Sequence, residues 1–160
     1  MNDTLNIDGK PISNTETHRT YHENGKLKEE IQVTNGKRHG ILKEYYETGE
    51  LLRKTPYVDG EIDGIVQGYY KTGKLSYVWP FVNDKQHGTQ KGYYYTGQLE
   101  WECPYVDGKL NGLYKGYYEN GKLMWECPHV DGKQHGLSKY YNENGELIEE
   151  ILYNNGKKWL

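Results

Sequence analysis

The residues with the clearest potential for covalent chemistry are Cys103 and Cys127, the only two cysteines among 160 residues. His129 follows Cys127 by two positions, so in a strand both side chains would lie on one face, about 7 Å apart. A cysteine nucleophile needs a base within hydrogen-bond contact, and this separation is loose for such a pair. We therefore expect buried, unpaired thiols, and a cysteine-dependent hydrolase is only a second alternative function.

Histidines and glutamates could bind a metal or act as acid and base, but their spacing keeps them apart. His39, His87 and His135 follow one another at intervals of 48 residues, which is about 19 Å in the sheet inferred below. That is too far to share a metal ion, and we expect each to hydrogen-bond backbone near a turn. Glu29 and Glu30 are adjacent and would point to opposite faces of a strand. We expect no catalytic residue, no metal site and no cofactor.

A repeat of 24 residues positions all of these side chains. Glycine recurs at this interval without a slip, and each glycine is followed two residues later by leucine. The six glycines are Gly25, Gly49, Gly73, Gly97, Gly121 and Gly145. Six copies therefore occupy residues 21–160, and we expect residues 1–20 to form an irregular N-terminal cap or tail.

Each copy contains two turn signals, of which Asn120-Gly121 and Asp107-Gly108 are examples. Such pairs favour two-residue hairpin turns because both residues take positive φ. With a two-residue turn at Asn120-Gly121, Tyr118 would face Leu123 and Tyr117 would face Met124. The intervening segments are too short for helices and are rich in Tyr, Val, Leu and Trp, so they are predicted to be strands.

These signals predict an all-β fold: an elongated, single-layer, open antiparallel meander sheet of six β-hairpin repeats, with about twelve strands. Proline recurs in mid-strand at Pro56, Pro80, Pro104 and Pro128. Because proline removes a donor from the ladder, the sheet should bend, bulge or part there. Cysteines one copy apart would be about 9–10 Å apart, which is too far for a disulfide.

The predicted register pairs glycine with an aromatic ring in the central copies. The three pairs are Gly68 with Tyr77, Gly92 with Trp101, and Gly116 with Trp125. A ring that lies across the neighbouring strand needs a missing side chain there. The outer copies have neither the glycine nor its aromatic partner at these positions: Glu44 faces Arg53 and Tyr140 faces Glu149. The rings should therefore form rows along one face, while the valines at 58, 82, 106 and 130 lie on the other.

Charged residues follow the same register. The expected cross-strand pairs are Lys91 with Glu102, Lys115 with Glu126, and Lys139 with Glu150. Lysines after the second turn should line one long edge of the sheet, at Lys37, Lys85, Lys109, Lys133 and Lys157. Glutamates should line the opposite edge, at Glu23, Glu47, Glu119 and Glu143.

The composition excludes several classes of function. The formal net charge is −3 and no phosphate-binding loop is present, so we expect no nucleic-acid partner. No stretch offers 18 consecutive apolar residues, and the N-terminus has no apolar signal segment. We therefore expect no integral membrane association and a cytoplasmic location.

The segment YYENGKL at 117–123 resembles the core of the bacterial variant of the MORN repeat. Related segments are YHENGKL at 21–27, YYETGEL at 45–51, YYKTGKL at 69–75, YYYTGQL at 93–99 and YNENGEL at 141–147. The resemblance implies an elongated sheet of hairpins. It also implies a likeness to the YwqK-like antitoxin family, whose members are proposed to neutralise a cognate bacterial toxin by binding it.

We therefore expect a non-enzymatic protein-binding module, in its most specific form a cytoplasmic antitoxin or immunity protein with a bacterial toxin as partner. A structural or membrane-surface scaffold that uses the lysine edge is the first alternative. Aromatic residues dominate binding hot spots, so the expected partner-binding residues are Tyr70, Tyr77, Trp79, Phe81, Tyr94, Trp101, Tyr105, Tyr118 and Trp125. The oligomeric state stays open, because terminal strands of an open sheet could also pair.

Overall fold

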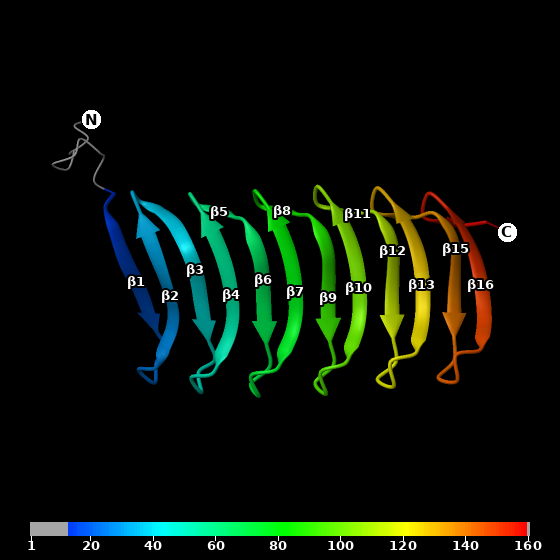
Figure 1. Ribbon diagram of the computed structural model, residues 1–160, viewed down its shortest axis with the longest axis horizontal. Coiled ribbons are helices and arrows are strands. Elements are labelled where there is room, and N and C mark those ends of the chain that lie inside the picture. The colour runs from blue at the N-terminus through cyan, green and yellow to red at the C-terminus, as the bar shows by residue number, and fades with distance from the viewer. Residues whose placement is uncertain (1–12, 160) are drawn as a thin grey trace.

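The computed structural model describes residues 13–159, which form one antiparallel sheet of 17 strands (Figure 1). Twelve strands are long: β1 Thr15–Tyr21, β2 Leu27–Thr34, β3 Lys37–Tyr45, β4 Leu51–Val58, β6 Gly64–Tyr69, β7 Leu75–Val82, β9 Gly88–Tyr93, β10 Leu99–Val106, β12 Gly112–Tyr117, β13 Leu123–Val130, β15 Gly136–Tyr141 and β16 Leu147–Asn154. Five have two residues: β5 Glu61–Ile62, β8 Lys85–Gln86, β11 Lys109–Leu110, β14 Lys133–Gln134 and β17 Lys157–Lys158.

The strands pair in chain order along a single curved layer, with β1 and β16 at opposite ends (Figure 1). This confirms the predicted all-β, open meander of hairpin repeats.

The N-terminal boundary differs from the expectation of an irregular segment over residues 1–20. Thr15–Tyr21 form β1, which pairs antiparallel with β2. Tyr21 lies at the same repeat position as Tyr45 and Tyr69, so β1 corresponds to β3 and β6 and is the first strand of the hairpin β1–β2. Its side chains are all exposed, and its sequence TETHRTY has no apolar alternation by which to detect a strand. The rest of that expectation, residues 1–12, lies outside the described residues.

The two turns of each copy have different geometries. In the second turn both residues take positive φ, as expected: φ is 49° at Asp107 and 81° at Gly108. In the first turn only Gly121 does, with φ 83°, and the Tyr118 N–H donates to the Lys122 carbonyl at 2.9 Å. The loop therefore has three residues, and the expected two-residue turn is wrong.

A bulge after this three-residue loop restores the register of the hairpin. Tyr117 faces Leu123, whereas Gly116 faces Trp125, so Met124 is an extra residue on β13. The expected pairings of Tyr118 with Leu123 and of Tyr117 with Met124 are therefore wrong. The extra loop residue and the extra strand residue cancel, so every pair beyond the bulge follows the predicted register.

Each mid-strand proline interrupts the neighbouring strand, as expected. Tyr105 faces Leu110 and Trp101 faces Gly116, so four steps along β10 correspond to six along β11 and β12. The two extra residues bulge out opposite Pro104, which has no N–H for the ladder. The Asn111 N–H donates to the Pro104 carbonyl at 2.9 Å and closes the bulge.

The core of this one-layer sheet lies on one face, which we call the ring face; it is a row of side chains to which β2 adds both Ile31 and Val33. The row takes one buried residue from each of several other strands: Leu42, Thr55, Val66, Gln90, Cys103, Cys127 and Ser138. On the opposite face, which we call the valine face, Val58, Val82, Val106 and Val130 are each 44–49% exposed. Burial is therefore one-sided, and the molecule has two chemically distinct surfaces.

Candidate functional site

The ring face is built by aromatic side chains that lie across glycines. Gly92 pairs with Trp101 in its own hairpin and with Tyr77 in the preceding one. Gly116 in the same way lies between Trp125 and Trp101. A Cβ added to Gly68, Gly92 or Gly116 would overlap the ring of Tyr77, Trp101 or Trp125, respectively. The three predicted glycine–ring pairs are confirmed, and the rings cover the backbone itself.

The rings also contact one another along the sheet. Tyr77 and Trp79 stack with centroids 4.2 Å apart. Tyr114 contacts the Trp125 ring edge-on at 4.5 Å and lies 6.2 Å from the Trp101 ring. Sequence reasoning missed Tyr114, because this repeat position carries Leu42, Val66, Gln90 or Ser138 in other copies. Tyr114 could have been assigned to the ring face because it is two residues from Gly116, and alternate residues of a strand share a face.

The structure brings together six of the nine expected partner-binding residues. Tyr77, Trp79, Phe81, Trp101, Tyr105 and Trp125 come from β7, β10 and β13, share the ring face, and are all half-buried.

Tyr70, Tyr94 and Tyr118 lie elsewhere, just beyond the ends of β6, β9 and β12 at the first turns. Their hydroxyls donate to backbone carbonyls of the next copy, those of Tyr93, Tyr117 and Tyr141, at 2.6–2.8 Å. These three tyrosines therefore connect neighbouring copies through backbone hydrogen bonds.

The cysteines are buried free thiols, as expected. Burial raises the pKa of Cys103 to about 11, so at neutral pH it is a protonated thiol and a poor nucleophile. His129 does not serve Cys127 as a base: its Nδ1 is 2.8 Å from the Cys127 carbonyl oxygen, to which it donates. The arrangement provides no cysteine–histidine catalytic pair.

His39 and His87 lie a few residues after the second turns of their copies, apart from each other. His39 Nδ1 is 3.6 Å from an Asp59 carboxylate oxygen, and His87 Nδ1 is 3.5 Å from one of Asp107. These side chains thus face an aspartate of the next copy rather than backbone. Across residues 13–159, no three His, Cys, Asp or Glu side chains converge as metal ligands.

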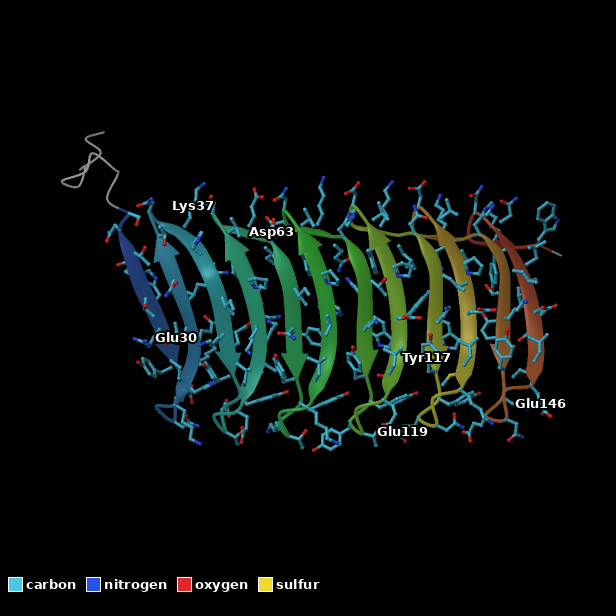
Figure 2. The ribbon with its side chains drawn as sticks, viewed as in Figure 1. Glu30, Lys37, Asp63, Tyr117, Glu119 and Glu146 are labelled. Carbon is cyan, nitrogen blue, oxygen red and sulfur yellow. The ribbon has the colours of Figure 1, made fainter. Side chains whose placement is uncertain are left out.

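The two long edges carry the expected charges. Figure 2 shows Lys37 at one edge and Glu119 at the other. The lysine edge also bears acids, and Lys109 Nζ is 3.3 Å from an Asp131 oxygen.

On the valine face the backbone register of Lys115 and Glu126 is as expected, but the ion pair is not. Lys115 Nζ lies 3.7 Å from Glu102, in the preceding hairpin. Lys139 and Glu150 form their expected pair, at 3.8 Å.

A single layer of hairpins stabilised by contacts between neighbours defines a repeat protein. Its family is the MORN repeat variant, which matches residues 17–35, 38–59, 62–83, 86–107, 110–131 and 134–155, and the chain therefore belongs to that family. No curated protein matches the chain. In the part of the chain that the structure describes, no helix has the length and hydropathy needed to cross a bilayer.

Proposed function

We propose that this protein is a non-enzymatic module that binds another protein through its ring face. The observation that carries this proposal is the set of six half-buried rings on three neighbouring hairpins. The rings of Tyr77, Trp101 and Trp125 rest on glycines of the sheet, and all six rings are partly open to solvent. Large, rigid side chains of this kind supply contact area at low entropic cost and are enriched in binding hot spots.

In its most specific form, the proposal is a cytoplasmic antitoxin or immunity protein that occludes a bacterial toxin. Its support is the resemblance of the YYENGKL-type segments to YwqK-like antitoxins. Because a toxin is neutralised by simple occlusion, this role requires a broad contact surface and no catalytic residue. A secreted polymorphic toxin encoded beside the gene would favour this form, and co-expression with that toxin should then restore growth of the host cell.

The binding face is tested by alanine substitution after the partner has been isolated with the full chain and purified. We expect Trp101→Ala and Trp125→Ala each to weaken the partner's affinity about 30-fold, the effect of a hot-spot loss of about 2 kcal/mol. The matched controls are Val82→Ala and Val106→Ala on the valine face, which should leave the affinity unchanged. Far-UV circular dichroism should be the same for all four variants. Unchanged affinity in both tryptophan variants would reject the ring face as the site.

A scaffold at a membrane surface is the second candidate, favoured by the lysine edge and by the exposed valines that pair with Lys85, Lys109 and Lys133. It predicts that the protein sediments with vesicles containing phosphatidylserine and is released at high salt, because screening weakens attraction to anionic lipid. Binding to such vesicles that is lost in Lys85→Glu, Lys109→Glu and Lys133→Glu, with no loss in Trp101→Ala, would favour the scaffold over the ring-face module.

A further inference from the structure

A hollow of about 260 Å³ lies on the ring face towards the C-terminal end of the sheet. Its lining residues are Tyr114, Trp125, Cys127, His129, Gln134 and Tyr140. Sites for drug-sized ligands typically measure roughly 300–1,000 Å³. This hollow is smaller, so its size suits one large side chain rather than a whole cofactor.

The hollow exists because the glycine series stops at Tyr140. Trp125 lies over Gly116 on one side and pairs with Tyr140 on the other. In the preceding copy the corresponding neighbours of Trp101 are Gly92 and Gly116, so a ring there has glycine on both sides. The Tyr140 side chain therefore forms one wall of the hollow, at a position where the central copies have glycine and no side chain. Tyr114, edge-on to Trp125, borders the hollow on β12 of the same hairpin.

His129 brings to this hollow an imidazole whose orientation is fixed by a hydrogen bond, while Gln134, Tyr114 and Tyr140 bring its other polar groups. A backbone carbonyl only accepts hydrogen bonds, so the contact with the Cys127 oxygen requires the proton on His129 Nδ1. In the neutral ring, Nε2 is then an acceptor. Among residues 13–159 no hydrogen-bond partner of Nε2 is found. Tyr114 packs beside the imidazole with ring centroids 6.2 Å apart and helps to hold its orientation.

We propose that this hollow is the anchor pocket of the ring face and that it takes a tryptophan side chain of the partner protein. This inference rests on the proposed protein-binding function. Aromatic walls favour an aromatic guest, which packs edge-on or offset against them. The indole N–H is a donor without acceptor capacity, which matches His129 Nε2. An acidic side chain would bring a second acceptor to this nitrogen.

The pocket can be tested without the partner, with N-acetyl-L-tryptophanamide as the probe. We expect saturable chemical-shift changes in an ¹H–¹⁵N spectrum of the full chain, centred on residues that line the hollow. The 1-methyl analogue, which has no indole N–H, should bind at least about 5-fold more weakly, the loss of one hydrogen bond of about 1 kcal/mol. His129→Phe should remove this difference. His135→Phe, at an exposed position outside the hollow, should keep it.

Three outcomes would overturn the pocket: no saturable change, equal affinity of the two probes for the unsubstituted protein, or changes centred on Trp101. Tyr140→Gly gives a second route, because it removes the wall and should weaken binding of both probes.

The purified partner then separates this inference from the proposed function. Loss of partner affinity in Trp101→Ala with none in His129→Phe or Tyr140→Gly would overturn the pocket and leave the ring face standing. Probe binding at the hollow with no loss of partner affinity in any ring-face variant would overturn the proposed function and the anchor role together.

Discussion

The N-terminal and central hairpins use the same backbone repeat to cover the ring face in two different ways. Between β2 and β4, the face is aliphatic: Ile31, Val33 and Leu42 are buried together, with Tyr57 packed against them. Between β7 and β13, rings lie over Gly92 and Gly116 instead. At the position of those glycines, β3 carries Glu44, whose carboxylate pairs with the guanidinium of Arg53.

The two regions therefore differ in role: the buried aliphatic side chains stabilise the sheet, whereas the central rings can also contact a partner. Ile31, Val33 and Leu42 at the N-terminal end are 9% exposed or less, whereas the central rings remain partly exposed. A ring over glycine covers the backbone with one side and leaves the other for a partner. Making a buried side chain smaller should therefore destabilise the N-terminal end, and adding a side chain at a glycine should destabilise the centre.

The largest expected effect is loss of volume at the aliphatic end. Leu42 is 6% exposed, and Leu42→Ala should lower the free energy of unfolding by about 2–5 kcal/mol, measured by urea denaturation. Ile41→Ala is the matched control: its side chain lies on the valine face and is 51% exposed. It should change stability by no more than about 0.5 kcal/mol. Similar losses in the two variants would contradict one-sided burial.

The next effect is gain of volume in the centre. Gly92→Ala should destabilise by about 1–3 kcal/mol, because the added Cβ overlaps the Trp101 indole. A double-mutant cycle isolates the cause. In a Trp101→Ala background the ring is absent, so Gly92→Ala should cost little or should stabilise the strand. Additive effects of the two substitutions would show that the ring does not rest on the glycine.

A smaller effect is expected for the hydrogen bonds between copies, which both regions share. Tyr94→Phe removes the hydroxyl that donates to the Tyr117 carbonyl at 2.7 Å and should cost about 0.5–1.5 kcal/mol. Tyr95→Phe is the control, since that ring is 57% exposed. Equal unfolding midpoints in urea for the two variants would argue against a stabilising role of the turn-edge tyrosines.

The smallest effect concerns alkaline pH. Desolvation, together with the hydrogen bond to Glu102, raises the pKa of Tyr117 to about 12 from an ordinary 10.0. The folded state thus favours the neutral phenol, so this stabilisation is complete below pH 10 and is lost as pH rises towards 12. Stability measured by denaturation between pH 9 and 12 should fall less steeply in Tyr117→Phe. An unchanged slope would contradict the raised pKa.

Much of this architecture was predictable because its signals are local and repeated. Asp107-Gly108 and its equivalents define the second turn through left-handed backbone, and proline marks each break in the ladder. The glycine–ring pairs could be predicted because pairing register couples two positions only a few residues from a turn. β1 was missed because an exposed edge strand has no apolar alternation, and Tyr114 because its repeat position carries several residue types.

The geometry of the first turn and its consequences were less accessible. Asn120-Gly121 is compatible with a two-residue or a three-residue hairpin, and only the paired strands select the latter together with its bulge at Met124. The roles of Tyr70, Tyr94 and Tyr118 depend on a carbonyl 23 residues further along the chain. Contacts of this kind between copies cannot be predicted from the spacing of residues within one copy.

By itself, the sequence determined the number of copies, the period of 24 and the three glycine–ring pairs, because turn residues and strand alternation act over a few neighbouring positions. Tertiary structure alone decided where the ring face is flat and where it is hollow. That depends on how neighbouring hairpins pair side by side: Trp125 meets Gly116 on one side and Tyr140 on the other only when the three strands β12, β13 and β15 align.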